Sequence, residues 1–230
     1  MKLPGITLFF FTCCFLVCIA PAKAQFGDES PVPYFRYALS FGGGPAMISG
    51  DLQGKALGAG IFLRGDYFLR HGISISLEAQ EGALRSGDQY DNIDSYPVTL
   101  LFFTGLLNVR FHPLMYMQDD HDRRIMYRKT YLQKAINTVY LGAGFGGMFN
   151  FTRSEAVRTY TNGSFFGYIY HTDIGVDLPL NRMAPYLMDS FMWYINVNGQ
   201  LNFAADKGMD GFGEQRDSYG MFSVGIKLKL

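Results

Sequence analysis

Cysteine is nearly absent from this chain of 230 residues. The only three, Cys13, Cys14 and Cys18, lie within residues 1–24, which have the form of a signal peptide for export. The expected mature chain, 25–230, therefore has no disulfide, no thiol nucleophile and no cysteine-built metal site. In an oxidising compartment a sheet or a packed core must hold such a chain together.

The signal peptide is predicted from three features of the N-terminal sequence. Lys2 gives a basic start, an apolar run covers Ile6 to Ala20, and Ala22-Lys23-Ala24 matches the small-x-small cleavage pattern, which places cleavage before Gln25. One alternative is an uncleaved anchor, but the run is short for a span of roughly 20 residues. The other is a lipoprotein signal on Cys18, but the bulky Val17 precedes this cysteine.

Charge is scarce and balanced. Asp, Glu, Lys and Arg make up 17% of the residues, with 20 acidic and 20 basic side chains. Removal of Lys2 and Lys23 leaves 18 basic against 20 acidic residues, a net charge of −2. This balance excludes a typical polyanion-binding protein. Aromatic residues reach 16% and glycine 27 residues, a composition typical of a lipid-facing sheet.

The mature chain also lacks any apolar run long enough for a transmembrane helix. Its most apolar stretch, Leu100 to Phe111, is interrupted by Thr104 and Asn108. A membrane role therefore cannot depend on helices, and closed β-barrels are the other structures that span a bilayer.

Alternation of apolar and polar residues with a period of two recurs along the mature chain. In 190–201, for example, Trp193, Ile195 and Val197 alternate with Asn196 and Asn198. This pattern indicates strands. The predicted strands are 35–48, 56–69, 73–80, 99–112, 138–150, 165–178, 190–201 and 222–230. We predict an all-β fold: one domain, 25–230, forming a transmembrane antiparallel up-and-down β-barrel of about eight strands.

The distribution of small and charged residues favours a membrane barrel over a soluble barrel with an apolar interior. Glycines cluster on the polar face of the strands, as a narrow lumen requires. Opposite charges on the same face can pair inside the barrel, away from lipid. The predicted lumen charge network comprises Arg64, Asp66, Glu78, Arg110, Asp173, Asp177 and Lys227. The aromatic residues predicted for the interfacial girdles are Tyr37, Tyr67, Phe111, Trp193 and Tyr219.

One connection on the predicted periplasmic side, 113–137, is longer than the turns usual there. Acidic residues precede basic ones in it, which suits a helix dipole, so we expect a short helix. Its mixture of basic and apolar residues predicts a docking element. The predicted partner-docking residues are Arg123, Arg124, Tyr127, Arg128, Lys129 and Tyr131. If a strand pair were miscounted, this segment would instead lie outside the cell.

No catalytic, metal-binding or cofactor-binding pattern is recognisable. His112 and His171 fall on the polar strand face without a companion serine and carboxylate at a suggestive spacing. The acidic stretch Asp206 to Asp210 does not match a calcium loop. A diffusion pore is not expected, because the interior of a barrel of about eight strands is filled by side chains. We expect neither enzyme, nor cofactor, nor small-molecule substrate, nor nucleic-acid partner.

Several short motifs together resemble a known family. They are Ile48-Ser49-Gly50-Asp51-Leu52, Arg64 with Asp66 and Tyr67, Leu84-Arg85-Ser86-Gly87-Asp88, Asn108-Val109-Arg110-Phe111 and Tyr140-Leu141-Gly142-Ala143-Gly144. Over most of the mature chain the sequence resembles the small Bacteroidetes outer-membrane barrels, a family that includes PorG of the type IX secretion system. One departure is the ending Lys229-Leu230, where such barrels commonly end on an aromatic residue.

The resemblance implies a non-enzymatic role in protein export at the cell outer membrane. It implies outer-membrane lipid as the surroundings and periplasmic ring proteins like PorK and PorN as partners. The segment 113–137 would suit that contact. The alternative is a free-standing outer-membrane barrel that acts through surface loops such as 151–164, in adhesion or envelope integrity.

Overall fold

The computed structural model describes residues 35–49, 56–86, 98–118, 130–154, 163–180, 192–205 and 217–230. The predicted signal peptide lies outside the described residues, as do the loop 155–162 and the acidic stretch Asp206 to Asp210. The described residues belong to one compact unit within Phe35–Leu230.

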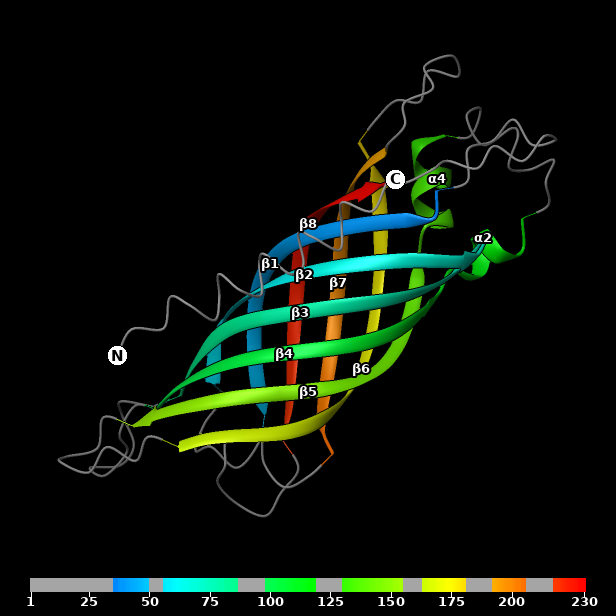
Figure 1. Cartoon of the computed structure of the whole chain (residues 1–230). Helices are drawn as coiled ribbons and strands as arrows, with labels where there is room; N and C mark the ends of the chain where they lie inside the picture. Colours follow the sequence, from blue (N-terminus) through cyan, green and yellow to red (C-terminus); the bar gives the residue numbers. More distant parts are fainter. Residues whose placement is uncertain are drawn as a thin grey trace. The chain divides into compact units, whose positions relative to one another are not determined.

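Eight strands form one closed antiparallel barrel in the order β1 to β8, which confirms the predicted fold class (Figure 1). Their bounds are β1 Tyr37–Ser49, β2 Ala56–Arg70, β3 Ile73–Ser86, β4 Val98–Phe111, β5 Tyr140–Ser154, β6 Gly163–Pro179, β7 Met192–Ala204 and β8 Ser218–Lys229. Each strand pairs with its neighbours in sequence, and β1 pairs with β8 to close the sheet. At this seam the Leu230 amide donates to the Tyr37 carbonyl over 2.8 Å.

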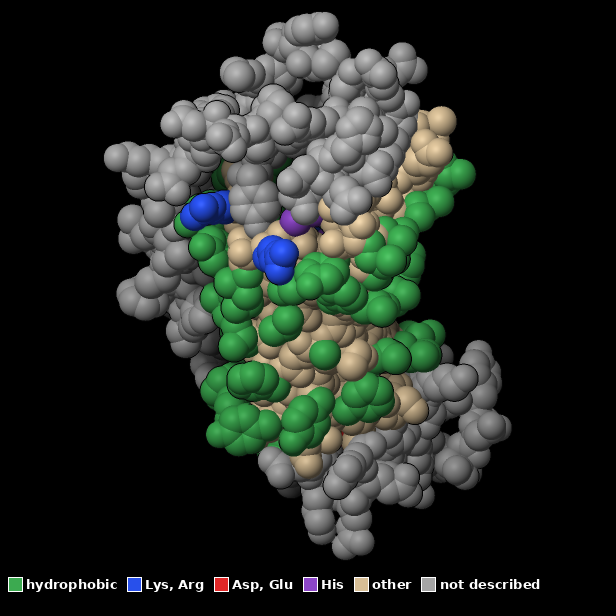
Figure 2. Space-filling model, turned by 90° about the vertical axis from the view of Figure 1, so that its right-hand side faces the viewer, with side chains coloured by type: hydrophobic (Ala, Val, Ile, Leu, Met, Phe, Trp, Pro, Cys, Tyr) green, Lys and Arg blue, Asp and Glu red, His purple; other side chains and the backbone are tan. Residues whose placement is uncertain are grey.

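The barrel wall alternates as the period-two pattern predicts. In β7 the inward Asn196 and Asn198 are buried, while Trp193 and Leu201 face outward. Figure 2 shows the outcome on one face, where hydrophobic side chains cover the wall and no acidic side chain is visible. An apolar exterior around a polar interior is what a membrane-spanning barrel requires.

The described residues of the β4–β5 connection form two short helices, α2 Pro113–Tyr116 and α4 Tyr131–Asn137, in a segment where a short helix was expected. Eight antiparallel strands place this connection at the same end of the barrel as the start of β1 and the end of β8. The alternative of a miscounted strand pair is therefore wrong. No helix among the described residues is long and apolar enough to cross a membrane.

Strands β2 and β3 are joined by a tight turn at His71 and Gly72, at this end of the barrel. Gly72 has φ 84°, and a Cβ there would lie 2.7 Å from the backbone nitrogen of Tyr116, at the end of α2. A glycine is needed at this position for both reasons. The turn and α2 therefore pack against each other.

Three sequence predictions need correction at the other end of the barrel. Strand β3 runs to Ser86 instead of ending at residue 80, and β8 begins at Ser218 instead of at residue 222. Tyr219 was predicted for the lipid girdle but is fully buried in the lumen. The common cause is that the inward face becomes apolar there, so the alternation inverts. Glu81 and Arg85 face outward, while Leu84 between them is buried.

Candidate functional site

The lumen contains a layer of buried charges, and all seven residues predicted for the charge network lie in it. Arg64, Asp66, Glu78, Arg110, Asp173, Asp177 and Lys227 are each at most 5% exposed. They come from strands β2, β3, β4, β6 and β8, and each occupies a position whose side chain lies on the inner face. The structure thus brings together residues that are far apart in the sequence.

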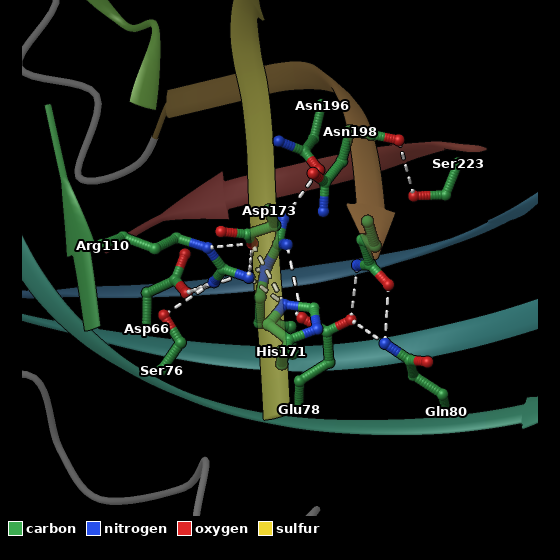
Figure 3. Close-up of polar contacts among 12 residues, drawn as sticks. Asp66, Ser76, Glu78, Gln80, Arg110, His171, Asp173, Asn196, Asn198 and Ser223 are labelled. Carbon is green, nitrogen blue, oxygen red and sulfur yellow. Dashed lines mark hydrogen bonds and ion pairs between the residues drawn. The ribbon is translucent and has the colours of Figure 1, made fainter. Parts of the chain in front are cut away.

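Arg110 lies at the centre of this layer (Figure 3). Its Nε donates to Asp173 Oδ2 over 2.7 Å, and its Nη2 lies 3.0 Å from Glu78 Oε2. Its Nη1 donates to Asp66 Oδ1 over 3.0 Å and to the Ser76 hydroxyl over 2.7 Å. One guanidinium group therefore links three carboxylates from three strands. The desolvation cost of burying the Arg110 charge is offset because nearly every N–H donor of its guanidinium has a partner.

Lys227 forms the second centre of the charged layer. Its Nζ lies 2.9 Å from Asp66 Oδ2 and 3.0 Å from Asp177 Oδ2. Asp66 thus contacts both Lys227 and Arg110, which joins the two centres. Lys229, which was not among the predicted network residues, also belongs to this layer, because its Nζ lies 3.6 Å from Asp177 Oδ2. Lys229 could have been found from the sequence, because it lies two residues after Lys227 and so on the same inward face of the last strand.

Asn196 and Tyr140 were also missed as members of this layer. Asn196 Oδ1 accepts from Arg64 over 2.6 Å, and its Nδ2 donates to Asp177 over 2.8 Å and to the Tyr140 hydroxyl over 3.0 Å. The Arg110 guanidinium lies 5.3 Å from the centre of the Tyr140 ring. Neutral side chains thus supply the remaining hydrogen bonds to the buried charged side chains.

A layer of amide side chains lies beside the charges. Gln80 Nε2 donates to Gln200 Oε1 over 2.7 Å, and both amides donate to Glu78 Oε1 over 2.8 Å. The Tyr219 hydroxyl donates to Gln80 Oε1 over 2.6 Å. His171 Nδ1 lies 2.7 Å from Asn202 Oδ1, so this predicted lumen histidine is a hydrogen-bonded interior residue.

An apolar plug fills the lumen toward the end opposite α2 and α4. We define it by its buried members: Ala46, Ile48, Phe62, Leu84, Leu100, Phe102, Leu106, Met148, Ile169, Ala204, Tyr219 and Met221. The Phe102 and Tyr219 rings pack 5.2 Å apart at its base. This plug was not predicted, because only small and charged residues were expected to fill the lumen. The plug and the charged layer together fill the described interior.

Gly142 illustrates how tightly the charged layer packs. A Cβ at this position would lie 1.8 Å from Asp173 Oδ1. We expect Gly142→Ala to displace Asp173 from Arg110 and to lower the free energy of unfolding by about 1–3 kcal/mol. Gly65→Ala is the matched control, because a Cβ there meets nothing within 4 Å. Urea unfolding in vesicles would measure both, and equal stability of the two variants would refute the tight fit.

His112 lies just beyond β4, at the barrel end that carries the helices. Its Nδ1 lies 3.3 Å from the Thr138 carbonyl oxygen, and its ring is 5.3 Å from that of Tyr140. Burial, with added repulsion from Lys227 and Lys229, lowers the pKa of His112 to about 3, against attraction from Asp177. This histidine is therefore neutral and joins the connection to the barrel.

This environment of His112 predicts a pH dependence of stability. Between the ordinary histidine pKa near 6.5 and the folded value of about 3, the unfolded chain binds a proton that the folded chain does not. Stability should therefore fall as the pH drops from 6.5 to 5, by up to about 2 kcal/mol, and stay constant above that window. Urea midpoints measured against pH for the wild type and His112→Asn test this. An unchanged pH slope in the variant would show that His112 is not the cause.

The predicted docking element is described only at its two ends. Tyr131 begins α4 and is exposed, whereas Arg123, Arg124, Tyr127, Arg128 and Lys129 lie outside the described residues. Helix α4 starts with a capping box, in which Thr130 accepts from the Gln133 amide and Gln133 accepts from the Thr130 amide. Its other end is tied to β6, because the Asp177 amide donates to the Thr138 hydroxyl over 3.1 Å.

The described residues contain no group of three or more His, Cys, Asp or Glu side chains arranged to hold a metal ion. The lumen carboxylates are instead committed to Arg and Lys partners at 2.5–3.7 Å. This arrangement pairs opposite charges inside a membrane-spanning barrel, and so keeps them away from lipid.

Comparison with solved structures finds other barrels of this size. The attachment invasion locus protein Ail of Yersinia pestis aligns with a TM-score of 0.49 at 8% identity, over 85% of this chain and 99% of Ail. Neisserial surface protein A aligns with a TM-score of 0.48 at 11% identity, over 84% and 97%. The outer membrane protein OprG of Pseudomonas aeruginosa gives 0.42 at 10% identity, over 88% and 99%. These values describe a similarity of fold. No known protein family and no curated protein matches the sequence.

Proposed function

We propose that this protein is a non-enzymatic barrel of the bacterial outer membrane that anchors a periplasmic ring complex of a type IX-like secretion machine. The observation that carries the proposal is the combination of a filled interior with a β4–β5 connection whose described ends form α2 and α4. A barrel filled by an ion-paired layer and an apolar plug has no described path for cargo. Its working parts must then be outside the lumen.

The connection that would contact the ring is held firmly to the barrel. Thr138 and His112 join α4 to the ends of β6 and β4. If β1 starts in the periplasm, as the even strand count allows, α2 and α4 lie on the periplasmic side. A load on the connection is then transmitted to the barrel wall through these contacts. Rings like those of PorK and PorN are the partners that the sequence resemblance implies.

The proposed contact with the ring is the segment 123–129, whose basic residues are Arg123, Arg124, Arg128 and Lys129. A photo-crosslinker at Tyr127 in the native envelope should capture a ring protein. The quadruple variant R123Q/R124Q/R128Q/K129Q should lose co-purification of the ring while the barrel stays inserted. A change in the charged layer such as K227M would not test docking, because it breaks ion pairs inside the barrel. Full recovery of the ring by the quadruple variant would overturn the docking role.

The second candidate is a free-standing barrel that acts through its surface loops. What favours it is the opposite end of the barrel, where four connections, between β1 and β2, β3 and β4, β5 and β6, and β7 and β8, gather. Epitope tags at positions 88 and 208 should be labelled on intact cells in either case. Loss of adhesion after replacement of 155–162, with ring binding unchanged, would favour this second function.

A further inference from the structure

Helices α2 and α4 leave apolar surface that the other described residues do not cover. Helix α2 buries no residue, and α4 buries only Ala135. Their exposed apolar side chains are Leu114, Tyr116, Met117, Tyr131, Leu132 and Ile136. Met117 and Leu132 are 77% and 67% exposed. Helices of four and seven residues are too short to be stable alone, so contacts outside the helices must contribute to their stability.

Two of the three exposed apolar side chains of α4, those of Leu132 and Ile136, lie on one side of the helix. Leu132 and Ile136 are one turn apart and share a face, whereas Lys134 is offset from Leu132 by about 200° and lies on the opposite side. Lys134 is also less exposed than either of them. Leu132 and Ile136 therefore form an exposed apolar strip on α4, next to the exposed Gln133.

This surface continues the lipid-facing wall of the barrel. The Tyr116 ring of α2 packs 5.5 Å from that of Phe111, the last residue of β4, which faces outward. The Arg70 guanidinium lies 5.7 Å from the centre of the same Tyr116 ring. An aromatic ring with a cation beside it is the usual arrangement at the boundary between lipid tails and headgroups.

We propose that α2 and α4 lie in the lipid interface at their end of the barrel, with Leu132, Ile136 and Met117 immersed among the acyl chains. The occupant of this apolar surface is then the bilayer and no protein. The continuity through Phe111 and Tyr116 carries this choice, because the adjoining wall already contacts lipid. Amphipathic helices with an outward apolar face bind at this depth. The inference is independent of the proposed secretion role.

Site-directed spin labelling tests the proposal on the mature chain, which has no cysteine of its own after removal of 1–24. Single variants Leu132→Cys, Ile136→Cys and Lys134→Cys would be labelled with a nitroxide in phospholipid vesicles. Leu141→Cys, on the lipid-facing side of β5, serves as the membrane standard. Collision rates with oxygen, which partitions into lipid, and with a water-soluble nickel chelate then report the surroundings of each label.

The ratio of oxygen to nickel accessibility at positions 132 and 136 should approach that at 141 and exceed that at 134 severalfold. Equal ratios at 132 and 134 would show that α4 stands in water, and would overturn the proposal. So would a label at 132 that neither reagent reaches, because protein would then cover the face. Retained heat-modifiable migration on gels shows in each case that the barrel has folded.

Discussion

Replacing Arg110 by methionine is expected to lower the free energy of unfolding of the barrel by about 3–5 kcal/mol. Arg110 contacts Asp66, Glu78 and Asp173 at once, so its removal leaves three buried carboxylates short of a cation. Methionine has similar length and no charge, which separates the loss of charge from the loss of volume. Urea unfolding in vesicles, followed by the fluorescence of Trp193, the single tryptophan, provides the measurement.

A double-mutant cycle separates the ion pair from the rest of the Arg110 environment. Asp173→Asn removes one carboxylate, and the pair R110M/D173N should be less destabilised than the two single changes added together. Arg70→Met is the control, because this exposed arginine has no part in the charged layer. If R110M matches the stability of R70M, buried charge pairing does not stabilise this barrel.

Truncating the apolar plug is the second change with a large expected effect. Phe102→Ala removes a ring that is 2% exposed and packs on Tyr219, and should lower the free energy of unfolding by about 3–5 kcal/mol. The neighbouring side chains of the plug cannot fill the gap left by the ring without losing their own packing contacts. The same vesicle unfolding assay measures the loss.

Phe145→Ala is the matched control for the plug. Phe145 faces outward from β5 and is 62% exposed, so acyl chains can fill the space that its ring leaves. The cost at Phe145 should be clearly smaller than at Phe102. Equal costs at the two positions would mean that the plug is packed no better than the lipid-facing wall, and that the lumen is loosely filled.

The fold was largely predictable from the sequence because its main determinant is local. A residue's parity within a strand decides whether it faces lipid or lumen, and the residues around Arg64, Arg110 and Asp177 show this parity clearly. Parity places the seven predicted charges on the inner face. It cannot say which carboxylate meets which cation, because that depends on the register between strands that are distant in sequence.

The contents of the lumen at the end opposite α2 and α4 could not be predicted in this way. There Leu84 and Tyr219 face inward while Glu81 and Arg85 face outward, so hydrophobicity and orientation no longer agree. The rule that apolar residues face lipid holds only where the interior is polar. Helix α4 was predictable in kind, but its start at Tyr131 depends on the capping box of Thr130 and Gln133, which charge patterning does not reveal.

The seam between β1 and β8 sets the order in which this barrel can be completed. Ten residue pairs from Ala38–Lys229 to Ser49–Ser218 join segments from opposite ends of the described chain. Closing such a distant contact is slow compared with pairing neighbouring strands. Until it forms, two strand edges stand open and can pair with other molecules. Whatever delivers this chain to the bilayer must therefore shield both edges until the last strand arrives.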